Sequence, residues 1–114
     1  MDAALPSVSS KRFRDGYTFD EYLRYLASPV NLAREGYEGG TRLSPTQRRA
    51  DLSRDVSDWY ASFALTEPQI QSIRLLAALP GGPARILVIS EEWSSDCRRD
   101  VPVFQHLAEA AGLD

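Results

Sequence analysis

The sequence predicts an α/β protein in which a helical N-terminal region precedes a single buried strand and a last helix. Apolar residues recur at helical spacing through much of residues 17–79. The run ARILVIS at 84–90 is continuously apolar, which is typical of a strand buried on both faces. We therefore expect a flexible lead-in at 1–16, a helical extension at 17–80, and a strand followed by a helix at 84–114.

The first helix is expected to begin after Thr18. Thr18 and Glu21 have the spacing of a capping box, and Tyr17 and Tyr22 have that of a hydrophobic staple. Pro29 should end this helix. The tyrosines could form a wall against which a ligand stacks, but packing between helices is the favoured interpretation.

Two further helices are predicted after a connector at 31–43. Ser44, Pro45 and Gln47 supply an N-cap, a first-turn proline and a capping partner for a helix over 45–64. The same signature at Thr66 and Gln69 opens a third helix. The helical unit should pack through apolar residues at helical spacing: Leu52, Val56, Trp59, Phe63, Ile70, Ile73 and Leu76.

The last helix follows the strand. One apolar stripe is expected along it, and Gly112 lies where a C-terminal glycine cap belongs. Cys97 lies on this stripe, and His106 lies off it, so a Cys–His pair is not expected and His106 should be at the surface. The stripe consists of Cys97, Val101, Phe104, Ala108 and Ala111.

Composition excludes several classes of function. The 114 residues suffice for one domain, and the formal net charge of −3 with interspersed acids argues against nucleic-acid binding. No apolar run approaches a membrane span, and the N-terminus lacks a signal peptide, so a cytoplasmic location is predicted. One cysteine and one histidine allow neither an internal disulfide nor the usual zinc site. No metal or cofactor is predicted.

The segment ILVISEEWSSDCRRDVPVF at 86–104 places Ser94 at the start of the last helix. Free amides and the helix dipole favour negative charge at that point, which is where a reactive cysteine would ionise. Serine occupies the place instead. The candidate site residues are Ser94 and Cys97, supported by Trp93, Ser95, Asp96 and Pro102.

This segment resembles the active-site strand and helix of the thioredoxin-like family. The family motif is Trp-Cys-x-x-Cys with a proline five residues beyond the second cysteine. Trp93, Cys97 and Pro102 match that motif, and Ser94 stands at the attacking cysteine. The acidic residues before Trp93 and the helices before the strand are similar to a bacterial branch that has a helical extension.

The resemblance implies a relative of thiol–disulfide oxidoreductases whose activity is impaired or lost. A serine hydroxyl is not ionised near neutral pH and cannot begin thiol–disulfide exchange, but Ser94 can cap the helix. Whether the chain is an enzyme stays open. Two alternatives remain: a non-catalytic protein-interaction module, and a redox sensor in which Cys97 pairs with a protein thiol or glutathione. A buried, inert Cys97 is the favoured interpretation.

The resemblance also implies that the thioredoxin unit is partial. A complete unit continues with further strands and a closing helix, whereas this sequence ends at Asp114. A strand at 84–90 would then lack partners for its backbone groups. We expect either a homodimer that pairs this segment with its copy, or a protein that continues beyond Asp114.

Overall fold

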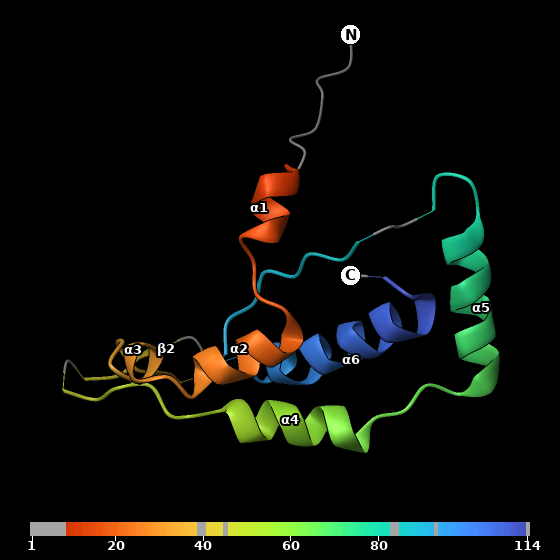
Figure 1. Cartoon of the computed structure of the whole chain (residues 1–114). Coiled ribbons are helices and arrows are strands. Elements are labelled where there is room, and N and C mark those ends of the chain that lie inside the picture. Colours follow the sequence, from red (N-terminus) through yellow and green to blue (C-terminus); the bar gives the residue numbers. More distant parts are fainter. Residues whose placement is uncertain (1–8, 39–40, 45, 83–84, 93, 114) are drawn as a thin grey trace, which may run out of the picture.

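The computed structural model describes residues 9–38, 41–44, 46–82, 85–92 and 94–113. Within these residues the chain forms helices, one short hairpin and long connecting segments (Figure 1). The two strands of the hairpin are antiparallel, with Tyr37 opposite Arg42. The elements in chain order are α1 (Ser10–Arg14), α2 (Phe19–Leu26), α3 (Pro29–Leu32), β1 (Tyr37–Glu38), β2 (Thr41–Arg42), α4 (Ser53–Ser62), α5 (Glu67–Ala78) and α6 (Ser95–Ala111).

Helix α6 is the element around which the others pack. It contacts both α4 and α5, and α2 packs against α4. Figure 1 shows α4 running alongside α6, with α5 standing across the C-terminal end of α6. Among the described residues, the buried apolar side chains come from three helices: Leu26 of α2, Val56 of α4, and Pro102 and Ala108 of α6. This core is small, because burial of apolar area is confined to the surfaces where these helices meet.

The predicted helix ends are largely confirmed. Both hydrogen bonds of the capping box between Thr18 and Glu21 are present, at 3.2 and 3.0 Å. The box between Thr66 and Gln69 is also complete and opens α5. Gly112 closes α6 with a φ of 69°, a left-handed conformation that glycine adopts without steric cost.

The predicted start of the second helix is wrong. α4 begins at Ser53, and Pro45 lies outside the described residues. Residues 47–49 instead pair with the segment before β1: the Gly36 N–H donates to the Gln47 carbonyl at 3.3 Å, and the Arg49 N–H donates to the Arg34 carbonyl at 3.3 Å. These bonds occupy backbone groups that a helix would need, so the helix starts later.

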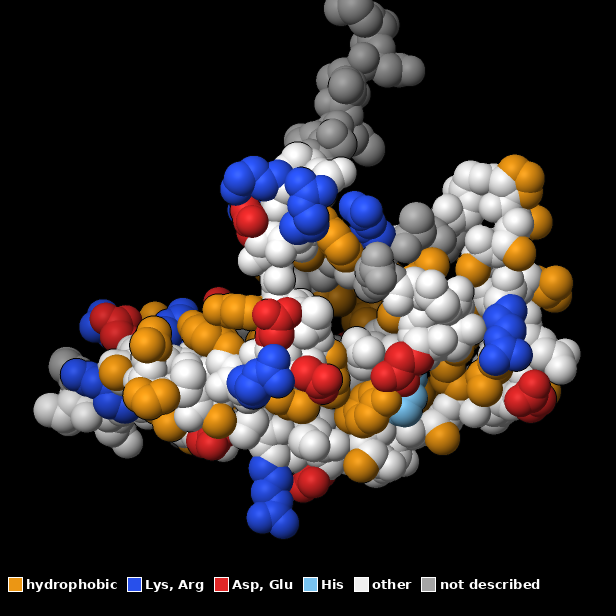
Figure 2. All heavy atoms as spheres, viewed as in Figure 1, with side chains coloured by type: hydrophobic (Ala, Val, Ile, Leu, Met, Phe, Trp, Pro, Cys, Tyr) orange, Lys and Arg blue, Asp and Glu red, His pale blue; other side chains and the backbone are white. Residues whose placement is uncertain are grey.

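Trp59 does not belong to the core, contrary to prediction. It is 44% exposed, and Leu76 on α5 is 59% exposed. The buried face of α4 is centred on Val56, and the next turn directs Tyr60 rather than Trp59 inward, where Tyr60 stacks on His106 with ring centroids 4.2 Å apart. Helix α5 packs on α6, but Leu75, Leu76 and Leu79 stay exposed, and Figure 2 shows apolar side chains at the surface over α5.

The predicted buried strand is not formed. Residues 85–90 have no strand pairing, and Ala84 lies outside the described residues. Ile89 is 94% exposed, and Leu87 and Val88 are also exposed. The reason is the absence of a partner: the hairpin of β1 and β2 is the only sheet among the described residues, and it does not include this segment. The α/β class is therefore represented here by the hairpin alone.

Three further observations concern the N-terminal region, the overall dimensions and the membrane-spanning potential of the fold. The lead-in that we expected to be flexible contains α1, whose first turn is capped by the Ser9 hydroxyl. The Cα radius of gyration is 16.7 Å, whereas a compact domain of this length has about 13 Å. No helix among the described residues is long and apolar enough to cross a membrane.

The positions of Leu26 and Trp59 give a stability prediction. Leu26 is fully buried, so Leu26→Ala should lower the free energy of unfolding by about 2–5 kcal/mol. Trp59→Ala should lower it by no more than about 1 kcal/mol, as for an exposed side chain. Urea unfolding followed by circular dichroism measures both. A larger loss for Trp59→Ala than for Leu26→Ala would contradict this description of the core.

Candidate functional site

The candidate site is built where the segment 85–92 leads into α6. Ser94 is the N-cap of α6, and its Oγ accepts a hydrogen bond from the Cys97 N–H at 3.4 Å. The Ser94 carbonyl accepts the first backbone bond of the helix, from Arg98 at 3.1 Å. The predicted cap is therefore confirmed. The hydroxyl satisfies an amide that the helix itself leaves unpaired.

Cys97 lies in the first turn of α6 and is half-buried rather than fully buried. Tyr22 of α2 lies close by, and its hydroxyl shares a hydrogen bond with the Ser90 hydroxyl at 3.0 Å. Burial raises the pKa of Tyr22, and the nearby Glu92, Cys97 and Glu91 raise it further, against the Ser90 hydrogen bond. The neutral phenol is therefore the form that the folded chain favours beside the thiol.

The other predicted site residues differ from Ser94 and Cys97 in their exposure to solvent. Ser95 and Asp96 are exposed on the first turn of α6, and Asp96 accepts a hydrogen bond from Arg99 at 3.3 Å. Pro102 is fully buried within α6, where it serves packing. Trp93 lies outside the described residues.

A buried carboxylate two residues before Ser94 organises the site. Glu92 is 6% exposed, and its Oε1 accepts a hydrogen bond of 2.8 Å from the Nδ2 of Asn31, which is itself fully buried. Arg49 Nη1 lies 3.5 Å from the same oxygen. Arg98 donates to the Glu92 carbonyl at 2.9 Å and pairs with Asp55 at 2.8 Å. Glu92 thus connects α3, α4 and α6.

Sequence reasoning missed Asn31 and Arg49, and it did not foresee that Tyr22 would reach the site. Asn31 and Arg49 fall in a region that the sequence marks only as a connector and helix start. The one signal available was the acidic pair before Trp93, since a carboxylate that enters the interior needs a donor.

His106 is not the surface histidine that we expected. Its side chain is 19% exposed, and its Nε2 lies 2.8 Å from the Tyr60 carbonyl. It is held between Tyr60 and Phe63, with ring centroids 4.2 and 5.3 Å away. His106 therefore packs α6 against α4 and is engaged away from Cys97.

The two groups at the motif positions of the site are the Ser94 hydroxyl and the Cys97 thiol. Both nearby guanidinium groups are engaged elsewhere: Arg98 with Asp55 and the Glu92 carbonyl, and Arg99 with Asp96 and Asp100. In the part of the chain that the structure describes, no group of His, Cys, Asp or Glu side chains could hold a metal ion.

The Ser94 cap can be tested by substitution. Ser94→Ala removes the acceptor for the Cys97 N–H, so the free energy of unfolding should fall by about 0.5–2 kcal/mol. Ser95→Ala, at the neighbouring exposed position, is the matched control and should change it by less than about 0.5 kcal/mol. Equal effects of the two substitutions in thermal or urea unfolding would show that the cap contributes nothing.

Comparison with known protein families gives one match. Residues 44–113 match the family model described as thioredoxin, which is more than half of the chain. The match includes α4, α5 and α6 and begins within the residues that we assigned to the helical extension. Searches of curated proteins and of solved structures gave no match. The resemblance inferred from Trp93, Cys97 and Pro102 is confirmed at the level of the family, and the chain belongs to the thioredoxin family.

Proposed function

We propose that this chain is a relative of thiol–disulfide oxidoreductases in which exchange activity is impaired or lost. The proposal rests on the position of Ser94 at the N-cap of α6. Its Oγ lies at the N-terminus of α6 and accepts the Cys97 N–H bond at 3.4 Å. In the family motif this is the position of the attacking cysteine, so the chain retains the helix start and has a hydroxyl in place of the nucleophilic sulfur.

The chemical consequence follows from the two steps of exchange. A thiolate attacks a substrate disulfide, and a second thiol then resolves the mixed disulfide. The Ser94 hydroxyl is not ionised near neutral pH, and the chain has one cysteine, so neither the attack at this position nor an internal resolution can take place. The helix dipole that would stabilise a thiolate meets a neutral hydroxyl at Ser94.

Cys97 supports a narrower redox role as a second candidate. It is half-buried, so a partner thiol or glutathione would have to approach it beside Tyr22 and the first turn of α6. A single thiol of this kind forms a mixed disulfide that only another molecule can resolve. The half-buried position and the engagement of Arg98 and Arg99 by other groups favour loss of activity over this sensor role.

An interaction role is supported by the exposed segment 85–90. Leu87, Val88 and Ile89 are exposed on backbone that has no strand partner among the described residues. Unpaired, apolar extended backbone is the surface on which another strand adds. We propose that this segment pairs with its copy in a homodimer, in which the main-chain groups and these side chains become covered together.

The loss of exchange activity predicts the behaviour of the unmodified chain and of one variant. The unmodified chain should give no turnover above background in a disulfide-reductase assay with a protein disulfide as substrate. Ser94→Cys places a second sulfur at the start of α6, and mild oxidation of this variant should yield an internal disulfide with Cys97. Thiol titration before and after oxidation, together with mass spectrometry, measures this result.

The control for the disulfide is the double variant Ser94→Cys with Cys97→Ser, which has one thiol and should stay titratable under the same oxidation. Turnover by the unmodified chain would refute the loss of activity. Two titratable thiols in oxidised Ser94→Cys would refute the assignment of Ser94 to the attacking position. Rapid modification of Cys97 in the native chain, absent in Cys97→Ser, would favour the sensor role.

Pairing of the segment 85–90 is tested by light scattering at micromolar concentration. The unmodified chain should have the mass of a dimer. Val88→Pro removes an N–H and disfavours strand pairing, so this variant should be monomeric, whereas Val88→Thr keeps a β-branched side chain and should stay dimeric. A well-folded monomer for the unmodified chain would refute the pairing.

A further inference from the structure

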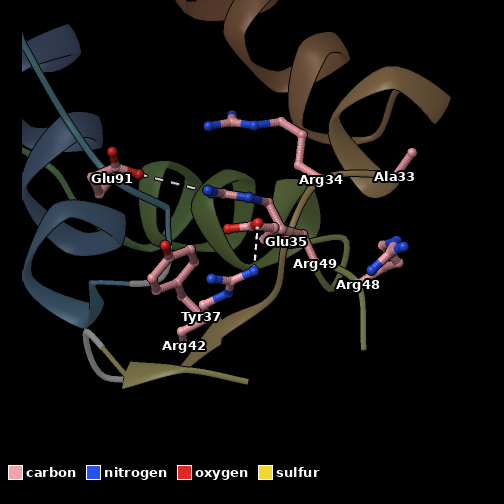
Figure 3. Close-up of a pocket in the computed structure, with 8 residues that line it drawn as sticks. All are labelled: Ala33, Arg34, Glu35, Tyr37, Arg42, Arg48, Arg49 and Glu91. Atoms are coloured by element: carbon pink, nitrogen blue, oxygen red, sulfur yellow. Dashed lines mark hydrogen bonds and ion pairs between the residues drawn. The ribbon is translucent and has the colours of Figure 1, made fainter. Parts of the chain in front are cut away.

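A pocket rich in arginine is lined in part by Glu91, the residue before the buried Glu92. Its volume is about 700 Å³. Four arginines and two glutamates line it, so positive charge is in excess by two, in a chain whose formal net charge is −3. The lining residues, all shown in Figure 3, are Ala33, Arg34, Glu35, Tyr37, Arg42, Arg48, Arg49 and Glu91.

Arg49 is the buried cation of this pocket. Its side chain is 7% exposed, and its Nε and Nη1 have no hydrogen-bond acceptor among the described residues. The carboxylates of Glu92 and Glu91 lie 3.5 and 3.8 Å from Nη1, close enough for charge pairing but not placed for a hydrogen bond. Leaving such donors unsatisfied costs about 1–3 kcal/mol or more for a charged group. An acceptor in the pocket would remove this cost.

The guanidinium groups of Arg34 and Arg42 also line this pocket. Figure 3 shows Arg34 and Arg49 directed to the side where Glu91 lies, Arg42 directed toward Glu35, and Arg48 at the opposite edge. Arg42 is paired with Glu35 at 2.7 Å.

Arg34 differs from Arg42 because its hydrogen bonds go to neutral oxygens. It donates to the Tyr25 hydroxyl at 2.8 Å and to Asn31 Oδ1 at 3.3 Å, and none of the described carboxylates forms an ion pair with it. The charge of Arg34 is therefore available to a ligand, and Arg49, although it lies against Glu91 and Glu92, still has two donors without an acceptor among the described residues.

We infer that this pocket binds the phosphate group of a small phosphorylated molecule. Guanidinium groups match phosphate oxygens with paired, charge-assisted hydrogen bonds, and two of them can contact one dianion. A volume of about 700 Å³ exceeds the size of a free ion and falls in the range of small-molecule pockets. Tyr37, over whose ring the Arg49 guanidinium lies at 5.6 Å, gives the pocket an aromatic wall for the rest of the ligand.

Glu91 is the internal competitor for this ligand. Its carboxylate is half-exposed and lies 3.8 Å from Arg49 Nη1. A bound phosphate would displace Glu91 from this contact. This inference does not depend on the redox proposal, because neither Ser94 nor Cys97 lines the pocket.

Calorimetric titration of the full chain with inorganic phosphate, ribose phosphate and adenosine monophosphate tests the inference. Saturable binding is expected for the phosphate esters, and a preference between them distinguishes a sugar phosphate from a nucleotide. Arg34→Gln should weaken binding about tenfold or more, since a charged hydrogen bond is lost. Arg54→Gln removes the same charge from the exposed face of α4, outside the pocket, and should change binding by less than about twofold.

A second pair of variants tests the same site by a substitution that should strengthen binding, and it leaves Arg34 unchanged. Glu91→Gln removes the competing carboxylate, so binding should tighten about threefold, whereas Glu67→Gln changes net charge equally on α5 and should have no such effect. The inference is overturned by any of three results: no binding of any probe, equal losses in Arg34→Gln and Arg54→Gln, or unchanged or weaker binding in Glu91→Gln.

Discussion

The rest of the structure depends on the polar contacts of Glu92, whose carboxylate is buried. It takes a hydrogen bond from Asn31 and lies against Arg49, while its carbonyl accepts from Arg98. Removing one partner of such a cluster leaves an uncompensated charge inside the protein, which lowers the free energy of unfolding by about 3–5 kcal/mol. Because the apolar core is small, these polar bonds fix where the segment 85–92 enters α6. They therefore fix where Ser94 and Cys97 lie.

At the start of α6, capping of the helix and disulfide exchange place different demands on the residue at position 94. An N-cap needs an oxygen that accepts an amide bond, whereas disulfide exchange needs a sulfur that ionises. Ser94 meets the first need at 3.4 Å from the Cys97 nitrogen and cannot meet the second. The start of α6 therefore depends on an accepting oxygen at this position and does not require an ionisable sulfur.

The sequence allowed prediction of local features and not of long-range ones. The caps at Thr18, Thr66 and Ser94 and the glycine end of α6 were predictable, because each depends on residues within one turn. The start of α4 was not, because residues 47–49 pair with residues 34–36 across a connector. Periodicity placed Trp59 in the core, although the helix turns Tyr60 inward toward His106. For the site, the positions of Ser94 and Cys97 were predictable, whereas the contacts of Glu92 with Asn31 and Arg49 join residues more than forty positions apart.

The fold encloses the polar pair Asn31 and Glu92 more completely than several of its apolar side chains, and this difference bears on function. Asn31 and Glu92 are both enclosed and bonded, while Ile89, three residues before Glu92, is 94% exposed. Exposure of a single isoleucine is ordinary, but a run of three exposed apolar side chains on backbone without strand partners is a surface suited to association. The polar cluster holds one end of this run in place through Glu92, so a strand that pairs with it would meet backbone that is already positioned. That positioning lowers the entropy lost on pairing, which is the main cost of adding a strand to an extended segment.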